Sequence, residues 1–209
     1  MSRVLNEYPA VALQPGKLSG RINFCDIFGR SSPVHIEIGS GKATFLVNEA
    51  KTKPYDNFLG IEWCNKIYRY AVDRVGRWGL GNVRIIRDDA ALFIKESVPD
   101  GAVDCFHIYF PDPWPKKRHH KRRFISSKNL EELLRCLKSG GIIKVATDHA
   151  DYFEQIKQVM ADKRLKTVEF FPTSGAQPDK GEWAGTNFER KYLKDGRQIF
   201  TLATQKDTM

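Results

Sequence analysis

The sequence predicts an α/β protein with a single domain, built on a doubly wound and mostly parallel sheet. From residue 34 onward, short apolar runs alternate with segments whose apolar residues recur at helical spacing. Residues 103–110 are almost continuously apolar, as expected of a parallel strand that is buried on both faces. Polar residues recur where the expected strands end, and ligands bind at that edge of such a sheet.

The alternation assigns most of the chain to strands and helices. We expect strands at residues 34–38, 58–63, 83–87, 103–110, 142–146, 167–171 and 198–204. We expect helices at residues 42–51, 66–78, 90–96, 127–137 and 151–161. Residues 1–33 contain several prolines and glycines and predict an N-terminal arm, partly mobile, ahead of a domain of residues 34–209. Ser139-Gly140-Gly141 is expected to end the helix before it, and residues 172–196 lack a regular period and predict a long loop.

Composition limits the classes of function. The 209 residues carry a formal net charge of +9 and a pI of about 9.4. Much of the positive charge lies in one block, residues 116–123, which suggests a polyanionic partner such as a nucleic acid. No apolar run reaches the roughly 18 residues of a membrane span. The start of the chain lacks the apolar core of a secretory signal, so we expect a cytoplasmic protein, and the four cysteines are too widely spaced for the common zinc patterns.

The end of the first expected strand has the features of a nucleoside site. Glu37 is followed by Gly39 and Gly41, which allow a tight turn and a close approach of the backbone to a ligand. The dinucleotide pattern needs a third glycine where this chain has Thr44, which argues against a nicotinamide cofactor. Glu62 ends the second expected strand, where a carboxylate can accept hydrogen bonds from both ribose hydroxyls of a nucleoside.

The third expected strand ends at Asp88-Asp89-Ala90. An acidic residue there can meet the edge of an adenine. The pattern leaves open which of Asp88 and Asp89 faces the ligand.

The segment after the buried fourth strand is the most informative one. Residues 110–116 read Phe-Pro-Asp-Pro-Trp-Pro-Lys, and the three prolines stiffen the loop. They hold Asp112 and Trp114 at the sheet edge with little conformational freedom. A carboxylate set among prolines beside a cationic block is hard to explain as a structural turn. We therefore expect residues 116–123 to contact phosphates next to a reactive centre.

These segments resemble the bacterial tRNA (guanine-N7-)-methyltransferases, the TrmB family, from about residue 24 to the end of the chain. The motifs that carry the resemblance are Glu37-Ile38-Gly39-Ser40-Gly41-Lys42, Gly60-Ile61-Glu62, Phe110-Pro111-Asp112-Pro113-Trp114-Pro115-Lys116, Thr147-Asp148-His149 and Thr186-Asn187-Phe188-Glu189. The proline-rich motif is highly specific, whereas the others gain their weight from their order along the chain.

The resemblance implies a Rossmann-like class I methyltransferase fold and methyl transfer from S-adenosylmethionine to N7 of guanine 46 in the variable loop of tRNA. It implies a cofactor site lined by Glu37, Gly39, Gly41, Glu62, Asp89, Ala90 and Asp112, with Asp112 as the catalytic residue. It implies that the substrate-side residues are Lys116, Asp148, Thr186, Asn187, Phe188 and Glu189. The family often has an arginine where this chain has Cys64, so a contact from that side chain is left open.

The chemistry of guanine fits this set of residues. N7 carries a lone pair and no proton, so attack on a sulfonium methyl needs no general base, and the main task is alignment. We expect Asp112 to hold the N–H edge of the guanine or to balance the positive charge that develops on the purine. We expect no metal ion.

Two alternatives remain. One is a methyltransferase that acts on an exocyclic base nitrogen, although its usual loop has a second proline where this chain has Trp114. The other is a non-catalytic RNA-binding protein on the same fold. The sequence does not decide between a monomer and a homodimer.

Overall fold

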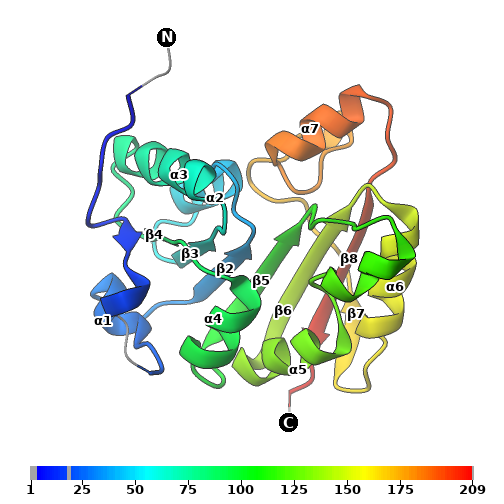
Figure 1. The fold of residues 1–209 in the computed structure, drawn as a ribbon. Helices are drawn as coiled ribbons and strands as arrows, with labels where there is room; N and C mark the ends of the chain where they lie inside the picture. Colours follow the sequence, from blue (N-terminus) through cyan, green and yellow to red (C-terminus); the bar gives the residue numbers. More distant parts are fainter. Residues whose placement is uncertain (1–3, 18–19, 209) are drawn as a thin grey trace. The chain divides into compact units, whose positions relative to one another are not determined.

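The structure is a computed structural model that describes residues 4–17 and 20–208 (Figure 1). The chain forms two compact units, of which the first ends at Pro99 and the second begins at Asp100. Each unit has its own strands and its own covering helices.

All strands of the first unit are parallel and are ordered β1-β4-β3-β2. Its strands are β1 (Ala12–Leu13), β2 (Val34–Ile38), β3 (Asn57–Ile61) and β4 (Val83–Ile86). Its helices are the 3₁₀ turn η1 (Pro15–Lys17), α1 (Phe24–Phe28), α2 (Thr44–Thr52), α3 (Asn65–Arg77) and α4 (Ala90–Ser97). Ile36, Leu59 and Ile85 are fully buried in the centre of this sheet, where α2 packs on β3 and α3 on β4. The carboxyl ends of β2, β3 and β4 therefore lie along one edge.

The described part of the expected N-terminal arm packs on the first unit. Its strand β1 pairs with β4, with Ala12 opposite Ile85. The backbone N–H of Asn6 donates to the buried Asp73 of α3 (3.2 Å). The ring of Tyr8 covers Gly76, also on α3, so closely that a Cβ at Gly76 would lie 2.0 Å from it.

The second unit ends in an antiparallel strand. Its strands are β5 (Val103–Tyr109), β6 (Leu137–Thr147), β7 (Leu165–Val168) and β8 (Phe200–Lys206). Its helices are η2 (Lys117–Arg122), α5 (Ser127–Cys136), α6 (Ala150–Met160), η3 (Pro178–Lys180) and α7 (Asn187–Lys194). The order is β5-β6-β8-β7, in which β5 and β6 are parallel and β8 is antiparallel to both of its neighbours. The prediction of an α/β fold with mostly parallel strands is confirmed.

Two local predictions are wrong. The chain passes from α5 directly into β6, so Gly140 and Gly141 lie inside the strand and do not form a turn before it. The pairing of β5 with β6 shifts between Val103 and Cys105, and Gly140 has a φ of 76° at this irregularity. The region of residues 172–196 is also not a single loop, because it contains η3 and the two-turn helix α7.

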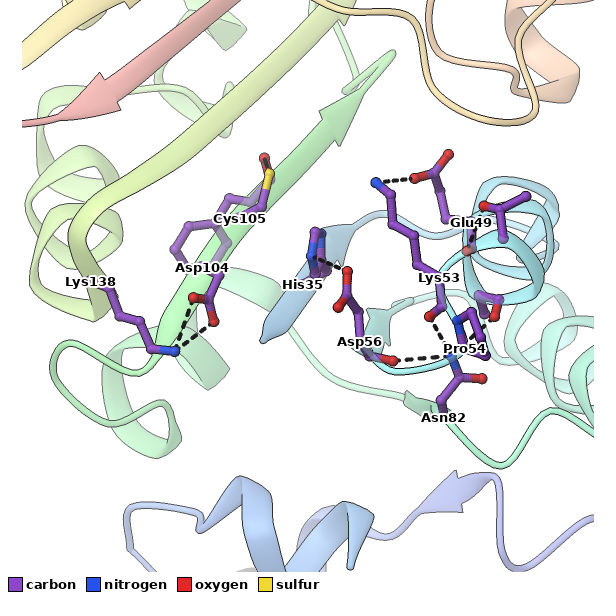
Figure 2. A network of polar contacts seen from close by, with 12 residues as sticks. His35, Glu49, Lys53, Pro54, Asp56, Asn82, Asp104, Cys105 and Lys138 are labelled. Atoms are coloured by element: carbon purple, nitrogen blue, oxygen red, sulfur yellow. Dashed lines mark hydrogen bonds and ion pairs between the residues drawn. The ribbon is translucent and has the colours of Figure 1, made fainter. Parts of the chain in front are cut away.

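Polar side chains connect neighbouring segments at the starts of strands within each unit (Figure 2). In the second unit, Lys138 forms an ion pair with Asp104 at 2.7 Å, across the irregular pairing of β5 and β6. In the first unit, the amide of Asn82 donates to the carbonyl oxygens of Lys53 and Asp56, at 3.2 and 3.0 Å. These contacts lie near the amino ends of β4, β5 and β6, whereas the polar residues discussed below follow the carboxyl ends of the strands.

Gly76→Ala tests the docking of the N-terminal arm. Alanine favours a helix over glycine by about 1 kcal/mol, but its methyl group would overlap the Tyr8 ring. We expect the variant to lower the free energy of unfolding by about 1–3 kcal/mol, measured by urea denaturation. In a Tyr8→Ala background the same change should become neutral or stabilising. A gain in stability with Tyr8 intact would contradict the observed packing.

Candidate active site

The turn after β2 adopts a backbone that few residues accept. Gly39, Gly41 and Ala43 have φ values of 71°, 55° and 56°. The backbone N–H groups of Gly39 and Ser40 both donate to the carbonyl of Ile61 at the end of β3, at 2.9 and 3.0 Å. The turn is thus bonded to the neighbouring strand and presents its backbone at the sheet edge.

Glu62 holds this turn from the next strand. Its carboxylate accepts the backbone N–H of Gly41 (2.9 Å) and that of Cys64 (2.8 Å). The predicted ribose-binding residue therefore has a fixed orientation beside the glycine turn. Cys64 is exposed and contributes its backbone here, at the start of α3.

Glu37 is the most unusual ionisable group of the first unit. It is 4% exposed, and its Oε2 atom has no hydrogen-bond partner among the described residues; the same holds for the buried hydroxyl of Ser40. Burial, followed by repulsion from the Glu62 and Glu49 carboxylates, raises the pKa of Glu37 well above its usual value. Unpartnered buried polar atoms and perturbed carboxylates are typical of ligand sites. The arrangement fits a ligand that brings hydrogen-bond donors or positive charge.

The two aspartates after β4 have structural partners. Asp89 is exposed and accepts the backbone N–H of Leu92 (3.0 Å) as the N-cap of α4, whose first residue is Ala90. Asp88 is half-buried and accepts the N–H of Asp89 (2.8 Å). Both aspartates shape the turn at the sheet edge, and a cofactor role for Asp89 stays a prediction.

Asp112 is exposed on a strained loop of the second unit. We call residues 110–115 the carboxylate loop. Phe110 and Trp114 have φ values of 53° and 43°, an unfavourable region for bulky side chains that costs about 1–3 kcal/mol each. The N–H of Phe110 donates to the Ala146 carbonyl of β6 (2.7 Å), which anchors the start of the loop. Asp112 is thus presented between two constrained residues.

The basic block divides into two parts. None of the residues of η2 (Lys117–Arg122) is buried, and Lys116 before it is exposed. The guanidinium of Arg122 lies over the Trp114 ring, 4.9 Å from its centroid. Arg123 is different, because its side chain is 1% exposed and cannot reach a phosphate. The predicted phosphate contact is therefore wrong for Arg123, and residues 116–122 form what we call the basic ridge.

Tyr192 of α7 lies among the predicted substrate residues. Its ring is 5.5 Å from that of Phe110 and 6.0 Å from that of Phe188. Burial raises the pKa of Tyr192, and the nearby Asp148 and Asp112 carboxylates raise it further. The structure thus brings Asp112, Asp148 and Phe188 around one tyrosine that our sequence reasoning missed, although Phe188 and Tyr192 have the i, i+4 spacing of a helix face.

Asp148 already has a partner in the structure. It accepts a hydrogen bond from Arg197 (2.6 Å), and the Arg197 guanidinium lies 4.6 Å from the centroid of the Tyr192 ring. The ion pair between Arg197 and Asp148 therefore lies over one face of the Tyr192 ring. Arg197 was also missed, since nothing in its sequence context points to Asp148.

The segment of residues 186–189 is a helix start. Thr186 caps α7 by accepting the N–H of Glu189 (3.0 Å). The fully buried Glu189 carboxylate accepts backbone N–H groups from Trp183, Ala184 and Gly185. These two residues therefore shape the turn, whereas the side chains of Asn187 and Phe188 are exposed.

Comparison with known proteins assigns the family. A family model described as "Putative methyltransferase" matches residues 31–202. A tRNA (guanine-N(7)-)-methyltransferase from Alkalilimnicola ehrlichii is 35% identical over 204 residues, which is 95% of this chain and 83% of that protein. The chain belongs to the tRNA (guanine-N(7)-)-methyltransferase family. The resemblance inferred from the motif residues is confirmed.

Solved structures support the fold of this tRNA (guanine-N(7)-)-methyltransferase family member. A SAM-dependent methyltransferase from Aquifex aeolicus matches with a TM-score of 0.56 at 14% identity, over 88% of this chain and 87% of that chain. The 16S rRNA methyltransferase KamB matches with a TM-score of 0.64 at 13% identity, over 88% and 92%. The family match runs through both compact units. Among the described helices, none is long and apolar enough to cross a membrane.

Glu37→Gln tests how much the ionisation of the buried Glu37 carboxyl destabilises the folded protein. The pKa of Glu37 is higher in the folded protein than in the unfolded chain. The folded state is therefore favoured most below the unfolded pKa, where Glu37 is protonated in both states. This stability is lost as the pH rises through the folded pKa, because the unfolded chain ionises Glu37 more easily. We expect the glutamine variant to be more stable than the parent at neutral pH. The difference should vanish below about pH 4, near the ordinary pKa of glutamate. Thermal unfolding at both pH values measures this, and an equal difference at both would contradict it.

Proposed function

We propose that the protein transfers the methyl group of S-adenosylmethionine to N7 of a guanine in tRNA, giving 7-methylguanosine. The observation that carries the proposal is the exposed Asp112 carboxylate on a constrained loop directly beside the basic ridge. Such a site offers an acceptor to a base and cations to the phosphates around it. By its resemblance to the family, the target is guanine 46 of the variable loop, and the protein acts in the cytoplasm.

The first unit has side chains suited to S-adenosylmethionine. The buried Glu37 carboxyl, whose Oε2 atom has no hydrogen-bond partner among the described residues, suits a ligand that brings a donor or a positive charge. We assign the ribose to Glu62, which holds the glycine turn. Gly39 and Gly41 supply the open turn, while Asp89 and Ala90 begin the helix after β4. We assign these residues of the first unit to the cofactor site. The cofactor supplies an electrophilic methyl group on a sulfonium.

The second unit has side chains suited to the guanine. N7 is unprotonated, so the protein need only align it, and cations must leave it free. We assign the N–H edge of the base, or the charge that develops on the purine, to Asp112. Phe188 and Tyr192 offer ring faces for stacking next to Asp148. Lys116 and Asn187 are exposed for contacts with the RNA, while Thr186 and Glu189 hold α7 in place.

The test is methyl transfer from labelled S-adenosylmethionine to unmodified tRNA, followed by nucleoside analysis. The proposal expects 7-methylguanosine, which should disappear when the variable-loop guanine is replaced. A methylated exocyclic nitrogen would contradict the site of transfer. Tight tRNA binding without any transfer would identify a binding protein on this fold.

Asp112→Ala separates catalysis from binding. We expect turnover to fall by at least about 100-fold, because the base loses its alignment. tRNA affinity should change less than about threefold, since phosphate contacts dominate it. Single-turnover rates and filter binding measure the two quantities. The matched control is Asp179→Ala in η3, an exposed aspartate of the same unit. Abolished tRNA binding with normal turnover at saturation would refute the role.

The basic ridge can be tested through salt. Lys117→Gln combined with Lys121→Gln should reduce the slope of log Kd against log salt by about 1 for each phosphate that the variant no longer neutralises. The control is Lys163→Gln with Lys166→Gln, the same charge change at the start of β7, the end remote from the strands' carboxyl edge. Equal slopes for both double variants would exclude a specific role for the ridge.

A further inference from the structure

Arg123 is a buried cation whose bonds run in three directions. Its Nε donates to the carbonyl of Pro113 at 2.8 Å. Its two terminal nitrogens donate to Gln155 (2.8 Å) and Asp151 (2.5 Å) of α6. The guanidinium also lies 4.8 Å from the ring centroid of Tyr152 on the same helix. One side chain thus joins the carboxylate loop to α6.

The Pro113 carbonyl, which accepts the hydrogen bond from Arg123, lies in a constrained part of the carboxylate loop. Pro113 lies between Asp112 and Trp114, and Trp114 has a positive φ. Such backbone conformations persist only where the surroundings fix them. The backbone of Phe110 is held by β6 at one end of the loop, and Pro113 is held by Arg123 near the other.

The partners of Arg123 are themselves fixed. Gln155 donates to the carbonyl of Ile125 (2.9 Å), and the Tyr152 hydroxyl accepts the N–H of Ile125 (2.9 Å). The helix α6 starts directly after Asp148, with His149 as its N-cap. Arg123 therefore links the loop that carries Asp112 to the helix that follows Asp148.

We propose that Arg123 is a positioning residue, which holds the carboxylate loop in its strained form and so sets the direction of the Asp112 carboxylate. The inference deepens the proposed function, because the role of Asp112 rests on it. The planar fork of arginine suits three acceptors at fixed directions, and lysine cannot reproduce it.

The first experiment observes the loop without any activity. Replacing Trp63, Trp78 and Trp183 with Phe leaves Trp114 as the single tryptophan. We expect Arg123→Lys in this background to increase the acrylamide quenching constant of Trp114 about twofold. Lys157→Gln, a surface change on α6, is the control and should leave quenching unchanged. Unchanged quenching in Arg123→Lys would overturn the proposal.

The second experiment separates kcat from KM. We expect kcat per cofactor-binding site to fall at least about tenfold in Arg123→Lys and further in Arg123→Met, because small displacements of a catalytic group are costly. The KM for tRNA and the salt slope should stay within twofold. A purely structural role would lower the amount of folded protein but not kcat per folded molecule. A flatter salt slope with unchanged kcat would identify Arg123 as an RNA contact and overturn the proposal.

Asp151→Asn tests the same link without replacing the buried Arg123, so it also serves if the Arg123 variants do not fold. Asp151 is 62% exposed, so this change should not harm folding, yet it weakens one bond to the guanidinium. We expect about a threefold lower kcat with an unchanged KM, and an unchanged kcat would count against the link to α6. If the parent protein makes no 7-methylguanosine, the proposed function fails, while the Trp114 measurement still decides whether Arg123 holds the loop.

Discussion

In each unit, the segments that carry candidate site residues depend on charged side chains that bond to main-chain atoms. Glu62 holds the glycine turn after β2, Glu189 holds the turn before α7, and Arg123 holds the carboxylate loop. Charge-assisted bonds are stronger than neutral ones, and each of these three acts on a segment that contains a residue with positive φ. Backbone conformations with positive φ therefore occur in this protein next to charged side chains that hold them in place.

Each unit contains one buried carboxyl among its candidate site residues. Glu37 lies buried next to two other carboxylates, and Glu189 is fully enclosed. The two differ in their partners, because Glu189 meets three backbone donors whereas Oε2 of Glu37 meets none among the described residues. Glu189 thus stabilises its turn, whereas Glu37 keeps one buried oxygen that could accept a hydrogen bond from a ligand.

The sequence predicts the parts of this protein that follow a period. The buried strand β5 and the helices α3, α5 and α6 lie within about two residues of their predicted ends, because apolar spacing determines them. The early start of β6 was missed, since two adjacent glycines suggest a turn unless the partner strand is known. The roles of Arg123 and Tyr192 were also missed, because the one is hidden in a basic block and the other gains its meaning from Asp112 and Asp148, which are distant in the chain.

The strand order of the second unit has a consequence for synthesis. β8 lies between β6 and β7 and supplies the neighbour of β7, although it follows both in the chain. A chain that emerges from the ribosome therefore holds β7 without a hydrogen-bonded strand beside it until residues 200–206 appear. Long-range pairing of this kind is slow, and unpaired strands are prone to aggregate. The second unit must complete its sheet after translation of β8, and nascent chains stalled before that point should be clients of chaperones.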